Sequence, residues 1–121
     1  MWTDITIDDM LKNIKSDEKS VIVDVRTEAE WRGTGIPSVA DTETLANTIV
    51  YPPEMLPNEN FLADFEASVD KDTTVYFVCR SGRRSQISST MADEKGYKCY
   101  NVLGGMIDWI ESGHPTMDYE S

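Results

Sequence analysis

Residues 75–85 read VYFVCRSGRRS, and this stretch decides how the chain folds. The apolar and aromatic run from Val75 to Val78 is typical of a strand that is buried on both faces. Cys79 follows directly, Gly82 stands at the centre of a short loop, and a helix is predicted over residues 84–95. In open parallel sheets, ligands bind beyond the carboxyl ends of the strands. Cys79 is therefore predicted to lie where such a fold places its functional groups.

Strand and helix patterns alternate along the rest of the chain. Strands are predicted at residues 2–5, 20–25, 48–51, 74–78 and 99–102, and helices at 7–14, 28–31, 61–69, 84–95 and 106–112. Residues 33–60 are expected to be mostly loop, because they are rich in glycine and proline. Met106, Trp109 and Ile110 share one face of the last helix and are predicted to be core residues. The alternation predicts an α/β domain whose mainly parallel central sheet is flanked by helices.

The length of 121 residues fits one domain over residues 1–121, with a core at about 2–115 and a short tail at 116–121. No signal peptide is evident, and no stretch reaches the roughly 18 apolar residues of a membrane span, so a cytoplasmic location is expected. The net charge of −11 opposes binding to nucleic acid and to anionic membranes. Neither is expected as a partner.

Three arginines of this acidic chain, Arg80, Arg83 and Arg84, fall within five residues directly after Cys79. A helix that begins there directs unpaired backbone N–H groups and the positive end of its dipole toward the sulfur. Cations and a helix N-terminus both favour the thiolate, which is the nucleophilic form of cysteine. Cations at a helix start oppose the dipole by some tenths of a kcal/mol, which a bound anion would offset. The arginines therefore indicate an anion site, with plain solvated charges as the alternative interpretation.

Other reactive groups are scarce. The single histidine, His114, lies in a turn after the last predicted helix, so a hydrolase built on a cysteine-histidine pair is not expected. Cys99 lies within a predicted strand and is expected to be structural. With two cysteines, one histidine and no C-x-x-C pair, a zinc site lacks ligands at a useful spacing. No metal and no cofactor are expected.

Three motifs in order resemble the rhodanese (thiosulfate sulfurtransferase) family. They are VDVR at residues 23–26 followed by Glu30 and Trp31, CRSGRRS at residues 79–85, and GGMIDW at residues 104–109 followed by Gly113 and Pro115. Residues 33–40 read GTGIPSVA and lack the histidine and second glycine of the family's G-H-I-P-G-A segment. The resemblance implies a five-stranded parallel sheet and a persulfide intermediate on Cys79.

The reaction implied by the resemblance is a two-step sulfur transfer. The Cys79 thiolate attacks the outer sulfur of a small anionic donor such as thiosulfate, and a thiol, cyanide or a protein cysteine then collects the sulfur. The expected active-site loop comprises Arg80, Ser81, Gly82, Arg83, Arg84 and Ser85. Asp24 and Arg26 are expected to support the base of the site, although a helical pair of Arg26 with Glu30 accounts for the arginine equally well.

Two alternatives remain open. A cysteine-dependent phosphatase or arsenate reductase shares the order of strand, cysteine, loop, arginine and helix. Enzymes of the tyrosine-phosphatase type place one more residue in the loop than the four that separate Cys79 from Arg84, and the smaller ring suits a single sulfur better than a phosphate. The other alternative is a module that carries or senses sulfur without turnover.

Overall fold

A computed structural model of the chain describes residues 2–16, 19–26, 28–38, 47–50, 63, 65–67, 69–80 and 84–118. For Glu28, residues 47–50 and Arg84 it describes the backbone alone. The expected active-site residues Ser81, Gly82 and Arg83 lie outside the described residues. Most of the loop predicted at residues 33–60 also lies outside the described residues, as does the beginning of the helix predicted from residue 61. Of that helix, residues 63 and 65–67 are described, and they are helical.

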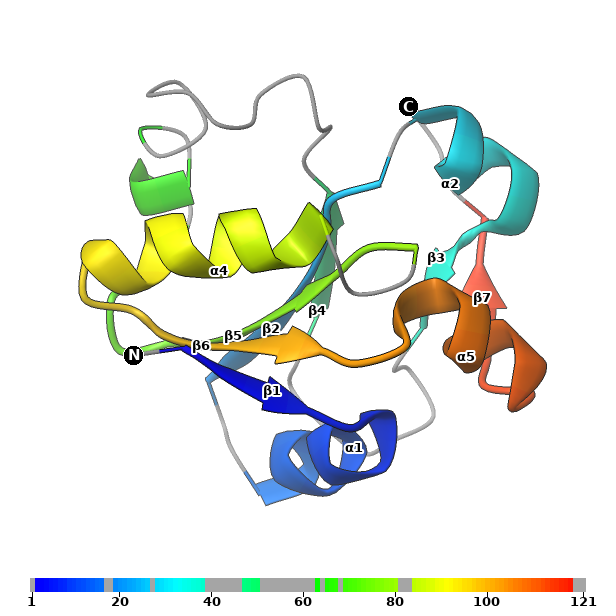
Figure 1. Cartoon of the computed structure of the whole chain (residues 1–121), viewed down its shortest axis with the longest axis horizontal. Coiled ribbons are helices and arrows are strands. Elements are labelled where there is room, and N and C mark those ends of the chain that lie inside the picture. Colours follow the sequence, from blue (N-terminus) through cyan, green and yellow to red (C-terminus); the bar gives the residue numbers. More distant parts are fainter. Residues whose placement is uncertain are drawn as a thin grey trace.

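The centre of the fold is a five-stranded sheet with the strand order β1-β6-β5-β2-β4 (Figure 1). Its strands are β1 (Thr3–Ile5), β2 (Ser20–Asp24), β4 (Asn47–Val50), β5 (Thr74–Val78) and β6 (Lys98–Val102). All neighbouring strands run parallel, which confirms the predicted α/β class with its mainly parallel central sheet. Asp24 of β2 pairs with Val78 of β5, so these two strands end at the same edge of the sheet.

Helices cover both faces of this sheet (Figure 1). They are α1 (Ile7–Ser16), α2 (Glu28–Thr34), α4 (Arg84–Glu94) and α5 (Gly105–Glu111). Thr6 caps the N-terminus of α1, because its Oγ1 accepts a hydrogen bond of 3.1 Å from the N–H of Asp9. Among the described residues, no helix is both long and apolar enough to cross a membrane.

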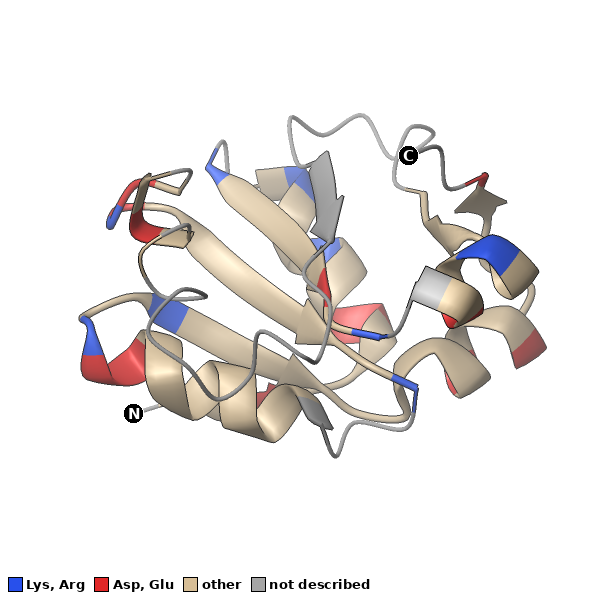
Figure 2. Cartoon of the chain, turned by 90° about the horizontal axis from the view of Figure 1, so that it is seen from above, with Lys and Arg blue, Asp and Glu red and all other residues tan. Residues whose placement is uncertain are grey.

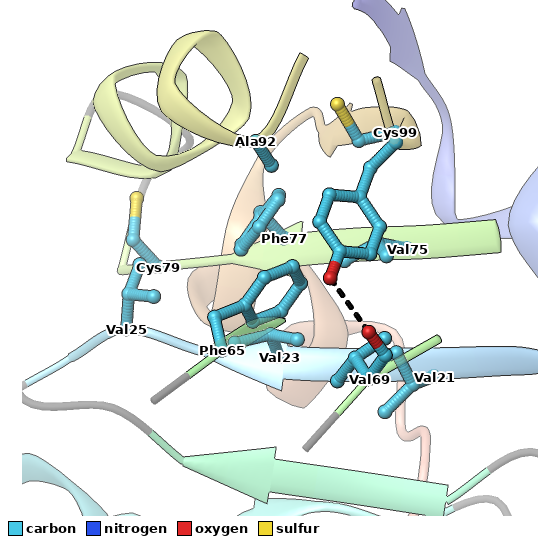
Figure 3. Packing of buried hydrophobic residues seen from close by; sticks show 11 residues of the cluster. Val21, Val23, Val25, Phe65, Val69, Val75, Phe77, Cys79, Ala92 and Cys99 are labelled. Carbon is cyan, nitrogen blue, oxygen red and sulfur yellow. Dashed lines mark hydrogen bonds between the residues drawn. The ribbon is translucent and has the colours of Figure 1, made fainter. Parts of the chain in front are cut away.

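Strand residues alternate between the two faces and divide the core into two clusters. One face packs against Phe65, Val69 and Ala92, and the close view of this cluster includes Cys79 and Cys99 (Figure 3). The opposite face packs against α1 and α5 through Met10, Ile14, Met106 and Trp109. Every residue of β2 and β5 is buried, which explains the apolar runs at the centre of both strands.

Two predictions about the C-terminal part are wrong. Ile110 is 43% exposed and is not a core residue, because α5 turns Met106 and Trp109 toward the sheet and Ile110 away from it. Thr116–Met117, assigned above to the tail, form β7, which pairs antiparallel with β3 (Ile36–Pro37) in a small second sheet. Such two-residue strands are too short for a periodic signal in the sequence.

Candidate active site

Cys79 lies directly after β5 at the carboxyl edge of the sheet, as the sequence predicts. Its side chain is fully buried, and its sulfur points toward α4 (Figure 3). The backbone N–H of Val25 donates a hydrogen bond of 2.9 Å to the carbonyl of Val78, so the end of β2 holds the end of β5. The sulfur therefore stands at a rigid position between the sheet and the first turn of a helix.

Ser85 lies in the first turn of α4 and contacts the Cys79 sulfur. Its Oγ donates a hydrogen bond of 3.4 Å to Cys79 Sγ, and it also contacts Oδ1 of Asn101 on β6. A hydroxyl has one proton, so Ser85 donates to one of these two acceptors at a time. It can therefore turn toward the sulfur when that atom carries negative charge.

Asn101 is a site residue that the sequence analysis missed. Its Nδ2 donates a hydrogen bond of 2.9 Å to Oδ1 of Asp4 on β1, which orients the amide oxygen toward Ser85. Asn101 is 1% exposed. The sequence held one indication of this role, because Asn101 is a polar residue between two apolar neighbours in a predicted strand. A polar side chain that is buried in a sheet needs specific hydrogen-bond partners.

The first turn of α5 fixes the backbone of Cys79. The N–H of Met106 donates to the carbonyl of Cys79 at 2.8 Å, and the N–H of Ile107 donates to that of Arg80 at 3.0 Å. Gly105 has a φ of +54°, and a Cβ atom on it would lie 2.3 Å from the Cys79 carbonyl oxygen. Only glycine allows the two backbones to come this close, which explains why the second residue of the GGMIDW motif is glycine.

Asp24 and Arg26 form a buried ion pair of 2.7 Å at the end of β2. The Arg26 guanidinium also donates to Oγ1 of Thr34 at 2.8 Å and to the carbonyl of Gly35 at 2.6 Å. The ion-pair partner that the structure gives Arg26 is Asp24, and the supporting role of the two residues in the site stays a prediction. The pair joins the carboxyl edge of the sheet to the end of α2.

Two arginines of the expected active-site loop, Arg80 and Arg84, lie within the described residues. Arg80 is exposed and follows Cys79, and Arg84 begins α4, which has 11 residues. Arg84's own side chain is not described. The structure therefore brings together Cys79, Arg80 and Ser85 of the predicted loop, with Asp24 and Arg26 at the neighbouring strand end.

Cys99 has a different environment from that of Cys79. Burial, with a smaller contribution from Asp93, raises the pKa of its thiol from 9.0 to about 11. Its Sγ–H donates to the carbonyl of Ser89 at 3.3 Å. Among the described residues, no three His, Cys, Asp or Glu side chains are grouped closely enough to hold a metal ion.

Comparisons with known proteins agree with this geometry. A family model described as Rhodanese-like domain matches residues 6–112. An uncharacterized protein of Rickettsia prowazekii is 38% identical over 87 residues, which are 69% of this chain and 67% of that protein. YtwF of Bacillus subtilis, named as a proposed sulfurtransferase, is 30% identical over 98 residues, 81% of each chain. The polysulfide-sulfur transferase of Wolinella succinogenes, a homodimer solved in solution, matches with a TM-score of 0.75 and 26% identity, over 99% of this chain and 80% of that one.

Proposed function

The chain belongs to the rhodanese-like domain family, and from this membership we propose that it transfers sulfur through a persulfide on Cys79. The observation that carries the proposal is the position of Cys79 at the carboxyl end of β5, against the first turn of α4. The names of YtwF and of the Wolinella succinogenes transferase support sulfur transfer as the reaction class.

In the first step, Cys79 Sγ attacks the outer sulfur of thiosulfate. A bond forms between Sγ and this sulfur, the S–S bond of the donor breaks, and its electron pair leaves with sulfite. The helix N-terminus and the Ser85 hydroxyl stabilise the negative charge on the persulfide. We assign donor binding to Arg83 and Arg84, whose charges suit a small dianion.

In the second step, a thiol, cyanide or a protein cysteine attacks the outer sulfur, and the Cys79 thiolate is released. Neither step requires a cofactor. The sulfur moves between Cys79 and the donor or acceptor, and no electrons pass to or from a separate redox group. We assign stabilisation of the anionic sulfur in both steps to backbone N–H groups of residues 80–85.

The test is mass spectrometry of the protein after incubation with thiosulfate. We expect an adduct with the mass of one sulfur atom on Cys79, which cyanide removes as thiocyanate. Cys79→Ser should form no adduct and release no product, whereas Cys99→Ser should retain most of both. Cys99 is buried beside Ser89 and lies at the amino end of β6, away from the carboxyl edge of the sheet where Cys79 stands.

Three outcomes would contradict the proposal. Equal loss in both folded variants would mean that the two cysteines act as a pair. An adduct that no acceptor removes would indicate a sulfur carrier or sensor without turnover. Efficient hydrolysis of an aryl phosphate, dependent on Cys79 and unaffected by thiosulfate, would replace sulfur transfer with phosphatase chemistry.

A further inference from the structure

A second hydrogen-bond acceptor competes with the Cys79 sulfur for the Ser85 hydroxyl. Ser85 Oγ lies 3.4 Å from Sγ of Cys79 and also contacts Oδ1 of Asn101 on β6. The single proton of the hydroxyl goes to one of these acceptors at a time. The strength of the Asn101 acceptor therefore decides how often the sulfur receives that proton.

Asp4 fixes which end of the Asn101 amide faces Ser85. Asn101 Nδ2 donates a hydrogen bond of 2.9 Å to Oδ1 of Asp4. A carboxylate oxygen only accepts hydrogen bonds, so the amide nitrogen must face Asp4 and the amide oxygen must face the hydroxyl. Asn101 is buried, whereas Asp4 is exposed on the edge strand β1. A surface carboxylate thus orients the buried amide that competes with the sulfur.

The surroundings of these side chains make each hydrogen bond count. Cys79 and Ser85 are both fully buried. β5 contains no charged residue and β6 contains only Lys98, at its amino end (Figure 2). A hydrogen bond is electrostatically stronger in such an interior than in water. One donated proton should therefore change the stability of an anionic sulfur measurably.

The two protonation states of Cys79 favour different directions of the Ser85 hydroxyl. A thiol sulfur is a weak acceptor, so beside a neutral Cys79 the hydroxyl donates to the amide oxygen of Asn101. A thiolate accepts a charge-assisted hydrogen bond, which is roughly twice as strong as a neutral one. When the thiol proton leaves to solvent, the hydroxyl keeps its own proton and turns to the sulfur. The hydrogen bond to Asn101 is lost in exchange.

We propose that Asn101, oriented by Asp4, is a positioning residue that holds the Ser85 hydroxyl away from Cys79 until the sulfur is anionic. It thereby sets the pH range in which Cys79 is nucleophilic. The proposal rests on the proposed function, which makes Cys79 the nucleophile, and names a control on that residue. It predicts opposite effects for two neighbours, because loss of the Ser85 hydroxyl disfavours the thiolate and loss of the Asn101 amide favours it.

The experiment measures how alkylation of Cys79 by iodoacetamide depends on pH. Peptide mass spectrometry distinguishes the Cys79 adduct from an adduct on Cys99. Relative to the wild type, Asn101→Leu should lower the midpoint pH by about one unit and Ser85→Ala should raise it by about one unit, since a hydrogen bond to a charged group has about this strength. A merely structural role of Asn101 would give no reason for the midpoint to fall.

The double variant Ser85→Ala, Asn101→Leu tests whether Asn101 acts through the hydroxyl. Its midpoint should equal that of Ser85→Ala alone, because the amide then has no hydroxyl to hold.

Asp4→Ala tests the same idea from the surface, where a substitution leaves the core intact. It frees the amide to turn and should lower the midpoint, as Asn101→Leu does. Asp4→Asn removes the same charge but keeps an acceptor for Asn101 Nδ2, so it should lower the midpoint less than Asp4→Ala.

Ser89→Ala is the matched control for Ser85→Ala. Ser89 is a fully buried serine of the same helix, but its Oγ donates to the carbonyl of Ser85 at 2.8 Å. This variant should keep the wild-type midpoint. Charged residues around the site include Arg80, Arg84, Asp24 and Arg26. They are the same in all of these variants, so their effects on the sulfur cancel in the comparison.

Two results would overturn the role of Asn101. One is a midpoint that both Asn101→Leu and Asp4→Ala leave unchanged or raise. The other is a fall caused by Asn101→Leu that persists when residue 85 is alanine. If Cys79 transfers sulfur as proposed, its loading by thiosulfate should shift to lower pH in Asn101→Leu by the same amount as alkylation. The expected alkylation midpoints without any persulfide on the wild type would support this role of Asn101 and overturn the proposed sulfur transfer.

Discussion

The carbonyl oxygen of Cys79 accepts a hydrogen bond of 2.8 Å from the backbone N–H of Met106. This contact ties the end of β5 to the beginning of α5, although the two residues lie in different motifs of the sequence. Residue 105 must be glycine for the two backbones to come this close. The geometry leads to a direct test.

Gly105→Ala should lower both stability and sulfur transfer. The added Cβ would lie 2.3 Å from the Cys79 carbonyl oxygen, and the φ of +54° adds backbone strain. We expect the free energy of unfolding to fall by at least about 1–3 kcal/mol. Gly96→Ala is the control, because Gly96 has a φ of +91° but open space around a Cβ. If urea unfolding and activity respond equally to both changes, the close approach is unimportant.

Asp24→Asn should destabilise the protein strongly. The change leaves the guanidinium of Arg26, which is 2% exposed, without its counter-charge. Loss of one partner of a buried pair costs about 3–5 kcal/mol. The same substitution at Asp72, whose pair with Lys19 is exposed, should change the melting temperature little. Similar losses in the two variants would mean that the buried pair has no special role.

Stability should fall in alkaline solution because of Cys99. Its pKa is about 11 in the folded protein and 9.0 ordinarily, so above about pH 9 the unfolded chain loses this proton first. Deprotonation then favours the unfolded state by about 1.4 kcal/mol for each pH unit between the two values. Below about pH 9 the thiol is protonated in both states and contributes no pH dependence.

The measurement is urea unfolding of the wild type and of Cys99→Ala at several pH values above about 8. The variant should lose stability less steeply with rising pH, because it lacks this titrating group. Parallel pH profiles for the two proteins would show that Cys99 ionises equally in the folded and unfolded states.

Replacement of Arg83 and Arg84 together by Ala should weaken donor binding. Hydrogen bonds to charged groups contribute about 1.5–3 kcal/mol each, so kcat/KM for thiosulfate should fall by at least about ten-fold. Alkylation of Cys79 by iodoacetamide should also slow, because local positive charge favours the thiolate. Arg32→Ala, an exposed change in α2, serves as the control. Unchanged thiosulfate kinetics in the double variant would remove the main support for an anionic donor.

The strands next to the site could be predicted because their signal is local. β2 and β5 each contain an apolar run, Val21–Val23 and Val75–Val78, and both strands are buried on the two sides of the sheet. Cys79 directly follows one of these runs, so its place at the carboxyl edge follows from the order of residues. The pairing of β3 with β7 could not be predicted, because each has two residues and the partner lies about eighty positions away along the chain.

The sequence by itself determined that a cysteine follows a buried strand, that three arginines follow the cysteine, and that a helix begins beside it. These are relations between neighbours in the chain, and local periodicity and charge report them. Only the tertiary structure decided that Asn101 meets Ser85, that Gly105 lies on the Cys79 carbonyl, and that α2 and α5 form a groove with Ile110 exposed. Contacts of this kind depend on how the crossover connections bring distant segments to one edge of the sheet, and a hydrophobic pattern specifies which face is buried but not what it is buried against.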